Sequence, residues 1–228
     1  MRKLLTLAVM ILTLIVANNL ANAQSNAPQW VKNLATKHKS NQLFIVAQVG
    51  EKTTAWVSMY EKINGELQQI MTTPAFIGKN GLGKEREGDN KTPVGVFHFD
   101  KAFGIAENPG CKIPYTQVDE NFYWSGERDF HYNELVDVRD YPGRTYVEGE
   151  HLTDYNPEYI YCLNMGYNAD CTPGKGSALF LHCFGSIKPW TGGCVAIPVD
   201  KMRFVMQNVK PDCVLIIDSL KKLGGNVD

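Results

Sequence analysis

The sequence has no excess of either charge. It holds 23 Lys and Arg residues against 24 Asp and Glu residues, which gives a formal net charge of −1 at pH 7. Proteins that bind nucleic acid carry a basic face, because cationic side chains must neutralise the phosphates. The composition therefore predicts no nucleic-acid partner.

Metal-binding and nucleotide-binding patterns are also missing. His98, His131 and His151 belong to no His-x-His or His-x-x-x-His motif, and the six cysteines form no Cys-x-x-Cys pair. The glycine-rich segment 78–97 has no Ser or Thr after either Gly-Lys pair, and Arg86 stands where a dinucleotide fingerprint needs glycine. We expect no metal and no cofactor, and we interpret the segment as a turn-rich loop that leads into a strand.

The chain has no apolar run of the roughly 20 residues that a membrane-spanning helix needs. Its one long apolar stretch, Leu4 to Ala17, follows Arg2 and Lys3 and precedes the small-residue site Ala21-Asn22-Ala23. This order is typical of a secretory signal peptide over residues 1–23. We therefore expect an exported protein of the periplasm or cell envelope, with no stable membrane insertion after cleavage.

The rest of the chain, residues 24–228, contains no repeat, low-complexity tract or linker, which predicts a single domain. Apolar runs at 43–49, 159–165 and 213–218 and a hairpin of 55–60 with 65–71 around Asn64-Gly65 predict strands. Helical spacing occurs only at 29–38 and 199–209. The pattern predicts a mainly β fold, a sandwich or barrel-like sheet with one or two short helices.

Two further apolar runs carry reactive side chains. Residues 178–182 predict a strand that ends on His182, and Cys194 opens the run 194–197 eleven residues later. Alternation places Phe180 and His182 on one face of the first strand and Cys183 on the other, so Cys183 is the buried thiol. Paired strands would bring His182 and Cys194 side by side.

This pair has the composition of a cysteine nucleophile and its base. A histidine that takes the proton of a nearby thiol supplies the thiolate that attacks a carbonyl. Gly192 and Gly193 permit a substrate carbonyl to approach the main chain, whose N–H groups can form an oxyanion hole. The competing interpretation, that Cys194 is one half of a disulfide, does not account for the histidine or the glycines.

The order of a strand histidine, a loop and Thr191-Gly192-Gly193-Cys194-Val195-Ala196 resembles the YkuD-type L,D-transpeptidase catalytic domain. The usual family signature has Ser-His-Gly-Cys followed by an apolar residue and Arg. The second His and the Arg are absent here, as in a divergent branch with Thr-x-Gly-Cys-Val-Ala. A second segment is also similar to the family, because a Gly-Asp loop leads into Thr92-Pro93-Val94-Gly95-Val96-Phe97.

The resemblance implies a mixed β-sandwich and an enzyme of peptidoglycan. Cys194 would be the nucleophile, His182 the base, and the segment Thr191, Gly192 and Gly193 the substrate and oxyanion site. The enzyme would release D-alanine from tetrapeptide stems, form a thioester and then make a 3-3 crosslink. The family orients its histidine with a main-chain carbonyl just after it, which here lies near Cys183.

Other functions keep the same pair of residues. With water as acceptor the protein would be an L,D-carboxypeptidase, and with other substrates an exported cysteine peptidase or amidase of the envelope. A non-catalytic envelope-binding module would keep the cleft and tolerate an oxidised Cys194.

The segment 101–161 is rich in aromatic residues and resembles a long insertion or lid. Aromatic side chains in such a segment more often pack it onto a sheet than bind a ligand. By resemblance, Trp124, Tyr132 and Asn133 are candidate cleft residues. Cys162 and Cys171 flank a turn and could form a local disulfide in an oxidising compartment.

Overall fold

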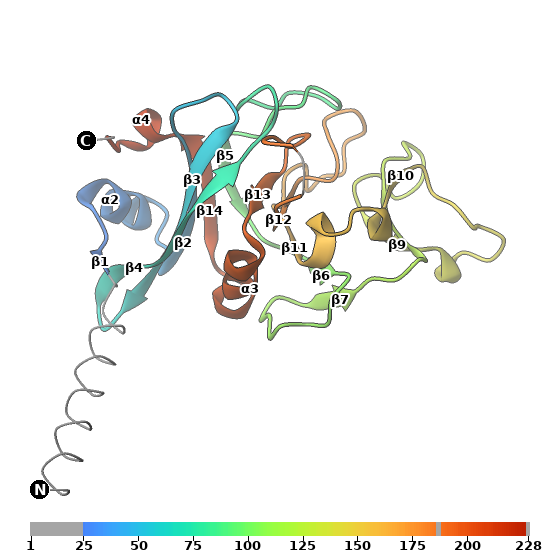
Figure 1. Cartoon of the computed structure of the whole chain (residues 1–228), viewed down its shortest axis with the longest axis horizontal. Coiled ribbons are helices and arrows are strands. Elements are labelled where there is room, and N and C mark those ends of the chain that lie inside the picture. The colour runs from blue at the N-terminus through green and yellow to red at the C-terminus, as the bar shows by residue number, and fades with distance from the viewer. Residues whose placement is uncertain (1–24, 186–187, 227–228) are drawn as a thin grey trace, which may run out of the picture.

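The computed structural model describes residues 25–185 and 188–226 (Figure 1). The predicted signal peptide, residues 1–23, lies outside the described residues. Within these two ranges, no helix combines the length and the apolar character needed to cross a membrane.

Most strands belong to one mixed sheet, with the order β5-β14-β2-β3-β4-β13-β12-β11-β6-β7 and with β1 paired to β4. Its strands are β1 (Ser25–Asn26), β2 (Gln42–Gln48), β3 (Thr54–Ile63), β4 (Glu66–Phe76), β5 (Gly95–His98), β6 (Ala102–Gly104), β7 (Tyr115–Gln117), β11 (Cys162–Asn164), β12 (Phe180–Cys183), β13 (Val195–Ile197) and β14 (Val214–Ser219).

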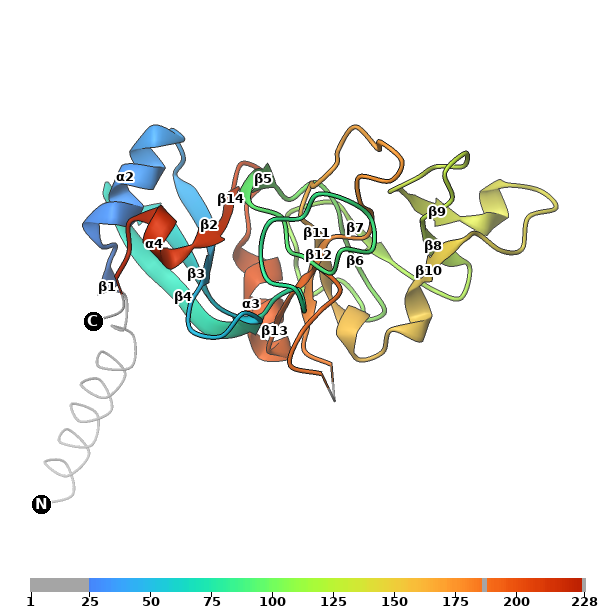
Figure 2. The same ribbon diagram turned by 90° about the horizontal axis from the view of Figure 1, so that it is seen from above.

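A second, three-stranded sheet and a few short helices complete the fold. The sheet has the order β10-β8-β9, and both views place it at the end of the molecule opposite α2 and α4 (Figures 1 and 2). Its strands are β8 (Phe122–Ser125), β9 (Leu135–Asp137) and β10 (Gly149–His151). The α-helices are α2 (Gln29–Lys37), α3 (Val199–Asn208) and α4 (Leu220–Leu223), and the 3-10 helices are η1 (Val138–Asp140), η2 (Leu152–Asp154) and η3 (Glu158–Ile160).

Strand β2 is apolar on both faces because both faces of the sheet are covered there. Leu43 and Ile45 pack on the side of α2 and α4, whereas Phe44 and Val46 face the main core. A strand buried on both sides is a nearly continuous hydrophobic run rather than an alternating one. The same holds for β14, which pairs with β2 in parallel.

The sheet curls around the main core. Side chains from β2, β3, β4, β11, β12, β13 and β14 all enter one hydrophobic cluster. Helix α3 fills it with Met202, Val205 and Met206, which are fully buried and lie at helical spacing. The mainly β architecture with few helices is therefore confirmed, as are the hairpin and the helices at 29–37 and 199–208.

The strands that carry His182 and Cys194 are neighbours. Strand β12 pairs with β13 in parallel, with His182 opposite Ala196. Leu181 and Cys183 enter the main core, whereas Phe180 and Cys194 belong to a separate cluster on the other face. The alternation predicted from the sequence is confirmed, and Cys183 is buried at 1% exposure.

Two local expectations are wrong. The strand predicted over 159–165 is limited to Cys162–Asn164, because residues 158–160 form the 3-10 helix η3. Cys162 and Cys171 are both free thiols, so the proposed local disulfide is absent. Cys162 is opposite His182 in the β11–β12 pair and fully buried, whereas Cys171 is partly exposed on the turn.

Candidate active site

Cys194 and His182 line the same cleft, which has a volume of about 560 Å³. Its wall combines the curled sheet with the loop 84–91 and with residues of the segment 101–161. Among the lining residues are Phe76, Lys84, Glu87, Glu150, Tyr155, Glu158, Tyr159, His182, Phe184, Lys188, Trp190, Thr191, Gly192, Cys194 and Ala196.

The imidazole of His182 is held in one tautomer. Its Nδ1 lies 2.7 Å from the carbonyl oxygen of Cys183. A carbonyl only accepts hydrogen bonds, so Nδ1 carries the proton and Nε2 keeps a lone pair. The carbonyl expected to orient the histidine is thus the one that contacts it, and Nε2 is left as a base.

The thiol of Cys194 forms hydrogen bonds with main-chain groups at the start of β12. Its Sγ donates to the carbonyl of Ala178 at 3.2 Å and accepts from the N–H of Phe180 at 3.3 Å. No hydrogen bond joins the described side chains of Cys194 and His182 in this arrangement. The thiol therefore rests against the strand that carries the base, in the same cleft, without being paired to it.

Burial keeps both groups neutral at rest. Burial, followed by the negative charge of Glu150, raises the pKa of the Cys194 thiol to about 12, although the N–H of Phe180 opposes this. Burial lowers the pKa of His182, against the opposing effects of the Cys183 carbonyl and the Glu158 charge. These shifts favour a thiol and an imidazole over a thiolate–imidazolium pair.

Two threonines from distant segments hold the main chain of the nucleophile. The carbonyl oxygen of Cys194 accepts hydrogen bonds from Thr191 Oγ1 at 2.6 Å and from Thr92 Oγ1 at 3.3 Å. Thr92 is fully buried, and its hydroxyl also accepts from the N–H of Gly78 at 2.9 Å. The second family-like segment thus supports Cys194 directly, a role that its sequence did not reveal.

The two glycines before Cys194 have different surroundings. Gly193 has φ +145°, and a β-carbon there would lie 2.8 Å from the carbonyl oxygen of Lys91. Its N–H donates to Thr191 Oγ1 at 3.1 Å. Gly192 lines the cleft, and a β-carbon on it would meet no atom within 4 Å. The N–H of Gly193 is therefore used in a hydrogen bond within the loop. The other N–H groups of this stretch that could bind an oxyanion are those of Gly192 and Cys194.

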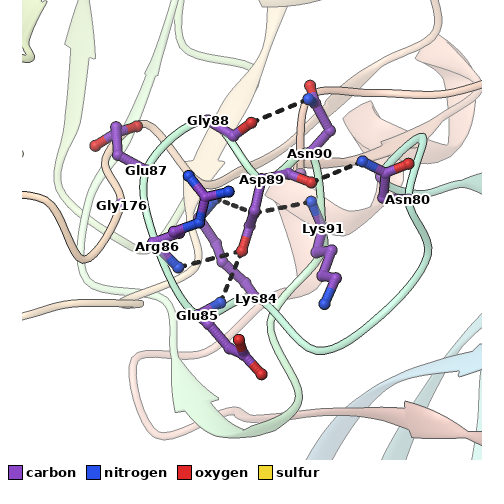
Figure 3. A network of polar contacts seen from close by, with 12 residues as sticks. Asn80, Lys84, Glu85, Arg86, Glu87, Gly88, Asp89, Asn90, Lys91 and Gly176 are labelled. Atoms are coloured by element: carbon purple, nitrogen blue, oxygen red, sulfur yellow. Dashed lines mark hydrogen bonds and ion pairs between the residues drawn. The ribbon is translucent and has the colours of Figure 1, made fainter.

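Asp89 organises the loop 84–91, which forms one wall of the cleft. Its carboxylate pairs with Lys84 at 3.0 Å and accepts hydrogen bonds from the N–H groups of Glu85, Arg86 and Lys91 (Figure 3). Burial alone would raise the pKa of Asp89, but these donors outweigh it and hold the pKa well below its usual range. The ion pair is almost fully buried, with side-chain exposures of 3% and 8%.

We expect Asp89→Ala to destabilise the protein by about 3 kcal/mol at pH 7, because it leaves the buried ammonium of Lys84 without a partner. The folded-state pKa of Asp89 is depressed, so its contribution is fully present above about pH 5 and is lost progressively as the pH falls below that. Urea unfolding of both proteins at pH 7 and pH 3 would measure this. Glu85→Gln, an exposed carboxyl of the same loop, serves as the control. Equal midpoints for Asp89→Ala and wild type at pH 7 would refute the role of the pair.

The three candidate cleft residues of the insertion lie behind the cleft rather than in it. Trp124 is 1% exposed and packs edge-on against Phe180, with ring centroids 4.7 Å apart. Asn133 Oδ1 accepts from Trp124 Nε1 at 3.0 Å and from the N–H of Ala178 at 3.1 Å. Tyr132 donates its hydroxyl to Glu87. These side chains fasten the insertion to the segment before β12, which confirms the packing interpretation.

Sequence reasoning missed the residues of the insertion that do line the cleft, namely Glu150, Tyr155, Glu158 and Tyr159. The hydroxyl of Tyr159 donates to Glu150 Oε2 at 2.5 Å, and its ring lies 5.5 Å from that of His182. No motif marks these positions, because long-range docking of the insertion determines which of its side chains reach the site.

Over residues 25–185 and 188–226, no cluster of three His, Cys, Asp or Glu side chains could hold a metal ion.

The model of the L,D-transpeptidase catalytic domain family matches residues 43–217 of the chain. This match includes the loop with Thr92, the strand with His182 and the segment with Cys194. No curated protein matches the chain significantly.

Two solved structures are similar to it at low sequence identity. One is an L,D-transpeptidase from Mycobacterium smegmatis, with 12% identity, a TM-score of 0.35, and coverage of 78% of this chain and 59% of that chain. The other is a fused Zn-dependent amidase/peptidase/peptidoglycan-binding domain-containing protein from Clostridium acetobutylicum ATCC 824, with 11% identity and a TM-score of 0.38. That match covers 90% of this chain and 59% of that chain, so the chain spans about three fifths of both proteins.

Proposed function

Because the chain belongs to the L,D-transpeptidase catalytic domain family, with 43–217 matched by its model, we propose that it is an exported peptidoglycan L,D-transpeptidase that uses Cys194 as nucleophile. The observation that carries this proposal is the shared cleft. In it, the thiol of Cys194 and an imidazole with a free Nε2 stand on one face of two paired strands.

The first half of the reaction follows from the geometry of the two side chains. In the proposed step, the Cys194 side chain rotates away from Ala178 and Phe180, and Nε2 of His182 takes the proton of its thiol. The thiolate attacks the carbonyl of the third residue of a tetrapeptide stem, and the imidazolium gives its proton to the leaving amine of D-alanine. The product is a thioester on Cys194.

The main chain around Cys194 offers N–H groups to the reacting carbonyl of the substrate. The carbonyl of Cys194 is fixed by Thr191 and Thr92, so the N–H groups of Gly192 and Cys194 are presented from an ordered main chain. We assign the oxyanion to these two groups, and Thr191 and Gly193 keep the loop in shape through their mutual hydrogen bond. In the second half, an amine of another stem attacks the thioester and forms a 3-3 crosslink.

Mass spectrometry of the protein and of its products tests this function. Residues 24–228 incubated with purified tetrapeptide muropeptides should release D-alanine, carry a tripeptide adduct on Cys194 and yield dimers. Tripeptide without dimer would identify an L,D-carboxypeptidase. A carbapenem adduct on Cys194 would support the transpeptidase family over a general cysteine peptidase. If the muropeptides do not change and no adduct forms, the substrate assignment is wrong.

A further inference from the structure

One carboxylate in the wall of the cleft has no part in the steps above. Glu150 lies in β10, directly opposite Trp124 of β8 in an antiparallel pair. Side chains directly opposite each other project from the same face. Trp124 packs on Phe180, which shares its face of β12 with His182. The register of the small sheet therefore aims Glu150 at the cleft, where it is a lining residue.

Gly149 makes this approach possible. It has φ +141°, and a β-carbon there would lie 2.2 Å from the carbonyl oxygen of Trp124. His151, the residue after Glu150, points to the other side of the strand. There its Nδ1 contacts Asp154 at 2.9 Å and its Nε2 contacts the carbonyl of Glu120 at 2.9 Å. In the short strand β10, the side chain of Glu150 therefore points toward the cleft and the side chain of His151 points away from it.

The carboxylate of Glu150 is held at one oxygen and open at the other. Oε2 accepts the hydroxyl of Tyr159, which is itself buried next to the imidazole of His182. Among the described residues no donor reaches Oε1, and no buried side-chain oxygen of these residues is without a partner. Oε1 is therefore accessible to the contents of the cleft.

The cations of the cleft do not neutralise this group. Lys84 forms an ion pair with Asp89, and Lys188 is exposed at the rim of the cleft. The negative charge of Glu150 acts on the nucleophile, because it is the second cause of the raised pKa of Cys194. A carboxylate that lines the same cleft as the acylated cysteine, with one oxygen open and no ion pair among the described residues, is suited to an ammonium group.

We propose that Glu150 is a further catalytic residue, which binds the ammonium group of the acyl acceptor and takes its proton. This inference rests on the proposed function. The acceptor then reaches the thioester as a free amine, its nitrogen bonds to the acyl carbon, and the bond to Cys194 Sγ breaks. The second amine proton passes through His182 to the departing thiolate, and Glu150 releases the first proton to solvent.

The protonation of Glu150 fits this role. Burial, opposed by the Tyr159 hydroxyl and aided by the charge of Glu87, raises the pKa of Glu150 to about 7. A base with a pKa near the working pH is both ionised and able to hold a proton. The titratable and charged groups that line the cleft or face Glu150 are Lys84, Glu87, Tyr155, Glu158, Tyr159, Cys162, His182, Lys188 and Cys194.

The test compares wild type, Glu150→Gln and Glu148→Gln, an exposed carboxyl just before β10, on purified tetrapeptide muropeptide. Dimer and tripeptide products are measured as a ratio, and the acylated enzyme is weighed intact. We expect Glu150→Gln to form the acyl-enzyme but to lower the dimer-to-tripeptide ratio at pH 8 at least about 10-fold. Glu148→Gln should match wild type.

Hydroxylamine separates this role from a loss of structure. It is uncharged near neutral pH, so it needs neither an ion pair nor a base that removes a proton before it attacks, and its N–H proton leaves through His182. Glu150→Gln should therefore form hydroxamate at a rate close to that of wild type. The advantage of wild type over Glu150→Gln in dimer formation should also vanish below about pH 6, where Glu150 is protonated. An unchanged dimer-to-tripeptide ratio, or an equal loss with hydroxylamine, would overturn the inference. If wild type itself forms no acyl-enzyme, the proposed function fails instead.

Discussion

Replacing Cys194 by alanine is expected to lower the rate of D-alanine release at least about 10⁴-fold, because Cys194 is the only cysteine among the described residues that line the cleft. The substitution removes one sulfur atom from a site that is 7% exposed, so the fold should persist. The measurement is the release of D-alanine from tetrapeptide muropeptides, with circular dichroism as the check on folding.

Cys183→Ala provides the matched control. This thiol lies one strand away, faces the main core and has a pKa raised to about 11 by burial. Its loss should reduce stability by about 1 kcal/mol and leave the chemistry in place. If Cys194→Ala kept more than a few per cent of the activity, the nucleophile would have to be another group and the mechanism above would be wrong.

Gly193→Ala is expected to reduce activity about 100-fold, whereas Gly192→Ala should keep activity within a few-fold of wild type. A methyl group on Gly193 would meet the carbonyl of Lys91 at 2.8 Å and the side chain of Leu179 at 3.1 Å, in a main-chain conformation that disfavours alanine. The loop must shift, and a displacement of about 1 Å at a reacting group costs about 100-fold in rate. Gly192 has open space around it.

The comparison of the two glycine variants uses the rate of acylation by a carbapenem, followed by intact mass, which reports the nucleophile without the acceptor. Both variants should have far-ultraviolet spectra like that of wild type. Equal rates for Gly192→Ala and Gly193→Ala would show that the contact with Lys91 does not position Cys194.

The parts of the fold that the sequence predicted are those with local signals. The runs that became β2 and β14 are apolar on both faces, and the hairpin of β3 and β4 has Asn64-Gly65 at its turn. The short strands β6 to β10 have three or four residues each and pair with segments far away or within the insertion. Their existence depends on tertiary docking, which composition and periodicity do not encode.

The residues of the candidate site also divide into those with a local sequence signal and those that depend on tertiary docking. His182 and Cys194 were predicted because strand alternation and a fixed loop place them on one face, and the structure has them there. Trp124 was a candidate cleft residue by resemblance, with packing as the favoured interpretation, and it supports the cleft from behind. Glu150 was not predicted, because the direction of its side chain depends on the register of β10 against β8, and no motif encodes that register.

The hydrogen bond from Thr92 to the carbonyl of Cys194 has a consequence for how the molecule acquires activity. It joins positions 102 residues apart in the sequence. Contacts between such distant residues form late, because a long loop must close before they stabilise anything. A fragment that lacks the segment with Thr92 still holds the thiol of Cys194 and the imidazole of His182, yet it loses one of the two hydrogen bonds that hold the carbonyl of Cys194. An ordered nucleophile loop therefore depends on a contact between two distant parts of the chain.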